Sequence, residues 1–200
     1  MQNLTLISGE GRYATDGNLI TIDFSRIVGL LNQPQECEKE NARWVIFANS
    51  NQVLSRQKDE LKNKGQFHAL WLDIDQTDLS INENLELIKK TLGDVFSLGF
   101  TTKSATQDNQ KARFIIPINH AVLFDEYEMI ATILNEQLTT LGVQCDHATT
   151  KPNQIAFLPN RGKYYESVMN RSATLFNPKE TFKDEIKAYK QRLKEMLHIN

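Results

Sequence analysis

The chain contains 200 residues and has a mass of 23.0 kDa, which is the size of one domain. Its 40% of apolar and 24% of charged residues exclude a mainly disordered or collagen-like chain. The net charge of −2 excludes a histone-like polycation. Two cysteines, Cys37 and Cys145, provide neither a disulfide framework nor a zinc site. No signal peptide or membrane-spanning segment is recognisable, so we expect a cytoplasmic protein without membrane contact.

The first 65 residues predict a layer of short strands and helices. Residues 19–24 alternate as a strand does, and Ser25 is suited to cap a short helix that ends near Leu31. Further along, the patterns predict a loop at 32–41, a short buried strand at 44–47 and a polar helix at 51–64 closed by Gly65.

Stronger patterns begin at residue 67. Residues 67–75 alternate as a strand, with Asp73 and Asp75 on one face and apolar side chains on the other. Ser80-Ile-Asn-Glu83 is a capping box that opens a helix stopped by Gly93. The later elements, in chain order, are strands at 95–102 and 112–118, a helix at 125–141 and a strand at 154–158.

This order, β-α-β-β-α-β, predicts an α+β fold with a ferredoxin-like (split βαβ) core. In such a core the four strands are antiparallel in the order 4-1-3-2. We expect one domain over 1–200, with an N-terminal α/β layer at 1–65, the core at 66–176 and a C-terminal helix at 177–200. The helix begins with Asn177-Pro178 and carries apolar residues at helical spacing, so it is expected to pack back on the domain.

Polar residues gather at one rim of the predicted sheet. The carboxyl ends of its first two strands share this rim with the amino ends of the other two strands. The residues that fall there are Asp73, Asp75, Thr102, Lys103, Ser104, Arg113, Asp146 and Lys151.

Asp73 and Asp75 are two residues apart, so both carboxylates leave the same face of an otherwise apolar strand. Such a pair is unfavourable unless a cation neutralises it, although an Asp-x-Asp that only caps a turn is the alternative. With Asp146 as a third oxygen ligand, the set suits Mg²⁺ or Mn²⁺. Lys103 and Arg113 are suited to a triphosphate, and Arg113 as plain surface is the alternative.

Three segments together resemble the archaeo-eukaryotic primase superfamily, most of all the primase-polymerase domains of plasmids and phages. They are Leu72-Asp-Ile-Asp75, then Phe100-Thr-Thr-Lys-Ser104 with Arg113-Phe-Ile-Ile-Pro117, then Cys145-Asp146 with Asn153-Gln-Ile-Ala-Phe-Leu-Pro159. The resemblance extends over about residues 43–176.

The resemblance implies an RRM-like catalytic core that joins nucleoside triphosphates on a single-stranded DNA template in plasmid or phage replication. By position, it implies that Asp73, Asp75 and Asp146 bind the catalytic Mg²⁺ or Mn²⁺ ions. It further implies that residues 102–106, with Lys103 and Ser104, bind the nucleotide beside Arg113. Lys151 and Arg161 would contact DNA, and a replicative helicase is a candidate partner.

Two other functions stay open. The family usually has Ser-x-His in its second motif, whereas this chain has Ser104-Ala-Thr106, so a primase-like module that only binds nucleic acid is one alternative. Residues 70–77 also fit the Asp-x-Asp-x-Thr motif of haloacid-dehalogenase-like phosphatases, with Asp73 as nucleophile. That family needs a late acidic pair and a parallel sheet; the chain lacks the acidic pair, and residues 95–118 resemble an antiparallel hairpin.

Overall fold

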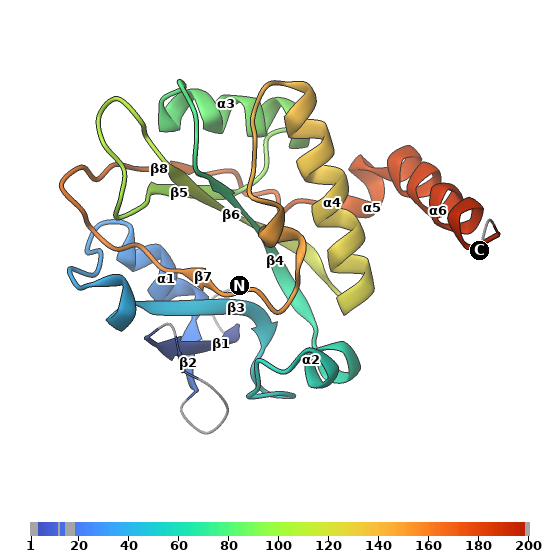
Figure 1. Cartoon of the computed structure of the whole chain (residues 1–200), viewed down its shortest axis with the longest axis horizontal. Coiled ribbons are helices and arrows are strands. Elements are labelled where there is room, and N and C mark those ends of the chain that lie inside the picture. Colours follow the sequence, from blue (N-terminus) through green and yellow to red (C-terminus); the bar gives the residue numbers. More distant parts are fainter. Residues whose placement is uncertain (1–3, 12, 15–18, 199–200) are drawn as a thin grey trace.

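The fold is built on antiparallel strands in two half-sheets that meet at a single paired position (Figure 1). The computed structural model describes residues 4–11, 13–14 and 19–198. Residues 1–3, 12 and 15–18 of the predicted N-terminal layer and residues 199–200 of the predicted C-terminal helix lie outside the described residues. The α+β class predicted from the sequence is confirmed.

The N-terminal part supplies most of the first half-sheet, whose strand order is β2-β1-β3-β7. Its strands are β1 (Thr5–Glu10), β2 (Ile20–Asp23), β3 (Arg43–Asn49) and, from much later in the chain, β7 (Ala156–Phe157). The helices here are α1 (Phe24–Leu30), the 3-10 turn η1 (Lys39–Asn41) and α2 (Lys58–Lys64).

The second half-sheet has the strand order β4-β6-β5-β8 and is covered on one face by two helices (Figure 1). Its strands are β4 (Phe67–Ile74), β5 (Ser97–Thr101), β6 (Ala112–Val122) and β8 (Ser167–Asn170). The covering helices are α3 (Ile81–Leu92) and α4 (Phe124–Thr140), and the 3-10 helix η2 (His147–Thr150) follows α4. The predicted capping box is present, because the Ser80 side chain accepts from the Glu83 amide and the Glu83 carboxylate accepts from the Ser80 amide.

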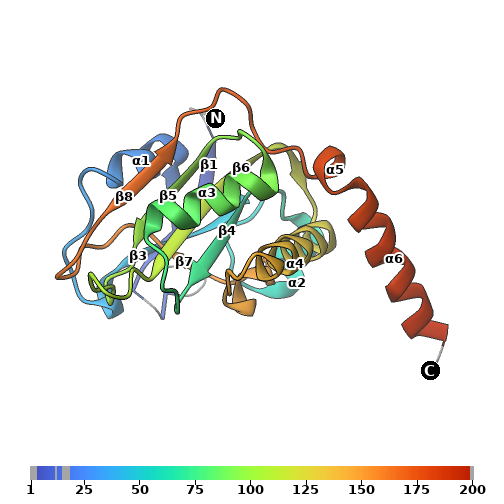
Figure 2. The same cartoon turned by 90° about the horizontal axis from the view of Figure 1, so that it is seen from above.

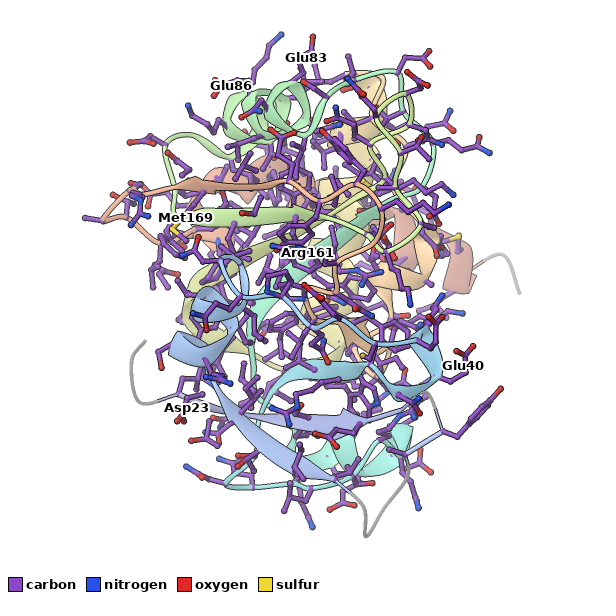
Figure 3. The ribbon with its side chains drawn as sticks, turned by 90° about the vertical axis from the view of Figure 1, so that its left-hand side faces the viewer. Asp23, Glu40, Glu83, Glu86, Arg161 and Met169 are labelled. Carbon is purple, nitrogen blue, oxygen red and sulfur yellow. The ribbon has the colours of Figure 1, made fainter. Side chains whose placement is uncertain are left out.

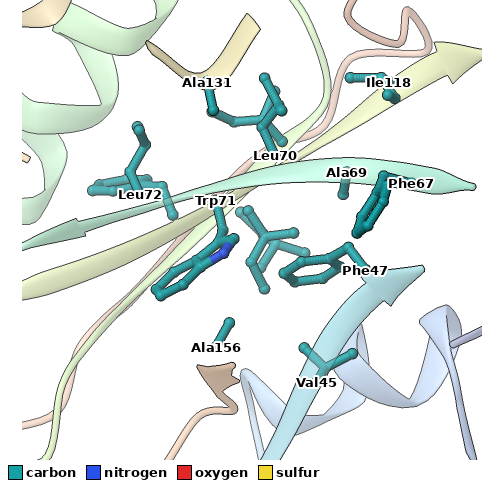
Figure 4. Close-up of a cluster of buried hydrophobic side chains, with 14 of the residues drawn as sticks. Val45, Phe47, Phe67, Ala69, Leu70, Trp71, Leu72, Ile118, Ala131 and Ala156 are labelled. Carbon is teal, nitrogen blue, oxygen red and sulfur yellow. The ribbon is translucent and has the colours of Figure 1, made fainter. Parts of the chain in front are cut away.

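Strand β4 is buried on both faces, one against helix α4 and the other against the first half-sheet. Leu70 and Leu72 lie on the side that faces Ala131 of α4 (Figure 4). Trp71 lies on the opposite side, toward Val45 and Ala156 of the first half-sheet (Figure 4). Because side chains alternate along a strand, Asp73 shares the side of Trp71 and points between the two half-sheets.

One prediction of strand pairing was wrong. The order of β4, β6 and β5 agrees with the predicted 1-3-2 part of the sheet. The predicted fourth strand, however, is shortened to Ala156–Phe157 and pairs with β3, at Trp44 and Val45, instead of with β4. The place beside β4 belongs to β3, through the pair Ala48–Phe67. Apolar alternation indicates a strand but contains no information on its partner, which is why this error arose.

The C-terminal segment forms α5 (Pro178–Thr181) and α6 (Lys183–His198), and α6 extends away from the rest of the chain (Figure 2). Phe182 is buried in the core, and Arg192 pairs with Glu136 of α4 at 3.0 Å. Ile186 and Tyr189 pack against the core whereas Leu193 and Leu197 are exposed, so the first half of the helix packs on the domain and its end does not. None of the described helices has the length and apolar character that a membrane crossing requires.

The close approach of β5 and β6 generates a test of the core. Gly99 stands opposite Phe114, and a Cβ atom at Gly99 would lie 2.4 Å from the Phe114 ring. We expect Gly99→Ala to lower the free energy of unfolding by about 1–3 kcal/mol, as overpacking does, in urea denaturation. Gly29→Ala is the control, since nothing lies within 4 Å of its added Cβ. Equal losses in both variants would contradict this packing.

Candidate active site

A cavity of about 570 Å³ opens between the two half-sheets at the end of β4. This volume is in the range of small-molecule sites. The lining residues are Lys39, Trp71, Asp73, Asp75, Thr102, Lys103, Ser104, Arg113, Asp146, Gln154, Ile155 and Phe157. The carboxylates predicted to bind metal and the residues predicted to bind nucleotide therefore line the same cavity.

Asp73 is the most enclosed of the three aspartates. It stands directly opposite Arg113 in the β4–β6 register, and its Oδ2 atom accepts a hydrogen bond from the Arg113 guanidinium in an ion pair. Its Oδ1 atom is buried and has no hydrogen-bond partner in the described structure. A buried carboxylate oxygen without a partner is costly, so Asp73 retains the capacity to bind one more positive group.

Arg113 connects the two half-sheets. Besides the ion pair with Asp73, its guanidinium donates to the Phe157 carbonyl oxygen of β7 at 2.7 Å and stands 5.2 Å from the centre of the Trp71 ring. The Arg113 side chain is only 10% exposed. It lines the cavity as the sequence suggested, but it is engaged with the protein on several sides.

Asp75 and Asp146 are exposed at the same cavity. Asp75 follows the end of β4, and one of its oxygens is 3.8 Å from Lys111 Nζ. Asp146 approaches β4 through its backbone, since its amide donates to the Asp73 carbonyl oxygen at 2.8 Å. Its carboxylate caps η2 by accepting from the Ala148 amide at 2.8 Å.

The donor chemistry of these three aspartates fits a hard divalent cation. Oxygen ligands are those that Mg²⁺ and Mn²⁺ prefer, and the buried Asp73 Oδ1 has no hydrogen-bond partner in the described structure. In the described part of the chain no three His, Cys, Asp or Glu side chains are close enough to form a metal cluster. Ion binding therefore requires the exposed carboxylates of Asp75 and Asp146 to turn toward Asp73.

The loop after β5 forms the basic wall of the cavity. Lys103 Nζ donates to the Cys37 carbonyl oxygen at 2.8 Å and pairs with Glu38 at 2.7 Å. Ser104 Oγ is 3.5 Å from Thr102 Oγ1. The loop is tightly covered, because a Cβ atom at Gly162 would stand 2.0 Å from the Lys103 carbonyl oxygen.

Lys151 and Arg161, the predicted DNA contacts, are not among the lining residues. Arg161 is labelled in Figure 3. It pairs with Glu36 at 3.3 Å and stands 5.5 Å from the centre of the Tyr165 ring. Lys151 is exposed just after η2. Both side chains lie on surfaces outside the cavity rather than at its wall.

Sequence reasoning missed Lys39 and Phe157, whose side chains lie together in the cavity wall, with Lys39 Nζ 5.4 Å from the Phe157 ring centre. Gln154 was also missed, although a polar residue at the start of an apolar strand is a recognisable signal. Nothing in the local sequence distinguishes Lys39 from other surface lysines, because only the placement of η1 brings it to the cavity.

The Arg113–Asp73 pair predicts a large effect on stability. Arg113→Met leaves the Asp73 carboxylate buried without its partner, so we expect the free energy of unfolding to fall by about 3–5 kcal/mol. Adding Asp73→Asn removes the uncompensated charge, so we expect the double variant to recover most of the lost free energy of unfolding. Urea denaturation of the four proteins in this double-mutant cycle measures the coupling, and strictly additive losses would argue against the pair.

Cys145 predicts a dependence of stability on pH. Burial, with a smaller contribution from the Asp73 carboxylate, raises the pKa of the Cys145 thiol from 9.0 to about 12. The unfolded chain therefore releases this proton at lower pH than the folded chain, so the free energy of unfolding falls as pH rises from 9 to 12. In Cys145→Ala we expect the free energy of unfolding to fall less steeply over this range, by up to about 1.4 kcal/mol per pH unit. Identical pH profiles of stability in the wild type and the variant would contradict this expectation.

Comparison with known proteins identifies the fold and the family of this chain. The AEP domain of the Cyanophage S-2L primase-polymerase (PrimPol) is a similar solved structure, with a TM-score of 0.53, 11% sequence identity and coverage of 92% of this chain and 89% of that chain. Identity this low shows a shared fold, and the predicted archaeo-eukaryotic primase fold is thereby confirmed. No curated protein matches the chain. The family described as VapE N-terminal domain matches residues 52–191, more than half of the chain, so this chain belongs to that family.

Proposed function

We propose that this chain is a divalent-metal-dependent primase-polymerase that joins nucleotides on single-stranded DNA during phage or plasmid replication. The observation that carries the proposal is the cavity between the half-sheets, which is lined by three aspartates from two segments of the chain and by the basic loop after β5. The primase-type fold and the VapE family membership support the same function.

In this proposal Asp73, Asp75 and Asp146 hold the Mg²⁺ or Mn²⁺ ions. Asp73 would contribute its unpartnered Oδ1 atom while Arg113 keeps Oδ2. Bound divalent ions would lower the pKa of the attacking 3′-hydroxyl and stabilise the negative charge of the departing pyrophosphate. Arg113, held by Phe157 and Trp71, orients the Asp73 carboxylate for this purpose and adds positive charge behind it.

In this proposal the basic loop after β5 binds the triphosphate of the incoming nucleotide. Lys103 would exchange its exposed partner Glu38 for phosphate oxygens, and Ser104 would donate its hydroxyl. Lys39 also lines the cavity and would add charge. Polymerisation then joins the 3′-oxygen of the growing strand to the α-phosphorus and breaks the bond from that phosphorus to pyrophosphate.

In this proposal the exposed basic residues Lys151 and Arg161, which lie outside the cavity, bind the template strand. Arg161 is anchored by its contact with Tyr165, so its charge is held at a defined position on the surface. Contacts of this kind bind phosphates without regard to sequence, as template binding requires. A replicative helicase is the proposed partner.

Of the two alternatives, the phosphatase is disfavoured by the fold, because β4 lies in an antiparallel sheet rather than in a parallel one. The binding module without catalysis remains the second candidate. The observation that favours it is Thr106, which stands where the family motif usually has histidine.

Incorporation of labelled nucleotides on a single-stranded DNA template, with Mg²⁺ or Mn²⁺, tests the proposal. We expect activity in the wild type and a loss of at least about 100-fold in Asp75→Asn, since a bound metal supplies several kcal/mol of transition-state stabilisation. Asp78→Asn is the matched control, because Asp78 is exposed a few residues away and does not line the cavity.

The outcomes separate the candidates. Activity that persists in Asp75→Asn would refute the metal site. A wild type that binds single-stranded DNA but incorporates no nucleotide with either metal would support the binding module instead.

A further inference from the structure

A buried hydroxyl lies directly behind the third aspartate. Thr149 of η2 is fully buried, and its Oγ1 atom donates to the Asp146 carbonyl oxygen at 2.8 Å. The Thr149 amide donates to the same oxygen at 3.1 Å. The Asp146 backbone is therefore held by two donors of one residue.

Helix α4 in turn holds Thr149. The Tyr127 hydroxyl donates to the Thr149 carbonyl oxygen at 3.3 Å, and Asn135 Nδ2 donates to Thr149 Oγ1 at 3.3 Å. Tyr127 and Asn135 are eight residues apart, so they lie on the same face of α4. Burial raises the pKa of the Tyr127 phenol, so this group keeps its proton and remains a donor.

The other end of this chain of contacts is the strand that carries the first aspartate. The Asp146 amide donates to the Asp73 carbonyl oxygen at 2.8 Å. Hydrogen bonds thus run from α4 through Thr149 and Asp146 to Asp73. A valine would fill nearly the same space as Thr149 without forming the side-chain bonds, so Thr149→Val removes these hydrogen bonds with little change in packed volume.

We propose that Thr149, oriented by Tyr127 and Asn135, is a positioning residue that holds Asp146 beside Asp73 so that the two carboxylates can share a divalent ion. This inference rests on the metal site of the proposed function. Such outer contacts fix the orientation of metal ligands and thereby set metal affinity.

Binding of Mn²⁺ alone, followed by electron paramagnetic resonance, tests the role of Thr149 without any catalytic readout. We expect Thr149→Val to bind Mn²⁺ about tenfold more weakly, the lower end of the effect of outer-shell changes. Thr149→Ser keeps the hydroxyl and should stay within about twofold of the wild type.

Thr150→Val is the matched control, because Thr150 is buried in the same turn but its hydroxyl donates to the His147 carbonyl oxygen at 2.9 Å. It should bind Mn²⁺ as the wild type does. If Thr149→Val does not fold, as judged by circular dichroism, Tyr127→Phe removes only one hydroxyl and should weaken Mn²⁺ binding about threefold, a smaller outer-shell effect.

Two kinds of failure can be told apart. Unchanged Mn²⁺ affinity in folded Thr149→Val, or equal weakening in Thr150→Val, would overturn the positioning role while the metal site stands. No Mn²⁺ binding by the wild type, or binding that is insensitive to Asp75→Asn, would overturn the metal site and this inference with it.

Discussion

The ion pair between Arg113 and Asp73 is the interaction on which the architecture of the site depends. It crosses from β6 to β4, and the same guanidinium reaches the Phe157 carbonyl of the opposite half-sheet. This ion pair adds to the packing of Trp71 toward Val45 and Ala156 in holding together the two half-sheets, whose described strands pair at Ala48–Phe67. A buried arginine can make these contacts at once because its planar group carries five donors in a fixed arrangement.

The same arrangement leaves the carboxylates in unequal surroundings. Asp73 is enclosed and paired with Arg113, while Asp75 and Asp146 are exposed, near Lys111 and the Ala148 amide respectively. On the far wall, Lys103 and Asn160 both donate to the Cys37 carbonyl oxygen, which ties the loop after β5 to the first half-sheet. The cavity therefore has an enclosed ion pair at its base and exposed acidic and basic side chains around it.

Much of the fold was predictable because helices and strands leave periodic patterns. The capping box at Ser80 and the alternation of β4 were found from the sequence and are present. Strands β1 and β8 were missed, and the helix predicted from residue 51 begins only at Lys58. Short strands carry few alternating positions, and the stretch before α2 is polar enough to fit either state, so local patterns could not decide these cases.

The sequence by itself determined which chemistry the chain can offer, since the spacing of Asp73 and Asp75 and the later Asp146 depend only on residue order and strand geometry. Tertiary structure alone decided that β7 pairs with β3, that Arg113 is engaged behind Asp73, and that Tyr127 and Asn135 of α4 hold Thr149. These contacts join residues far apart in the chain, and each depends on how layers pack against one another. Packing is set by the whole core at once, so no local pattern of residues encodes it.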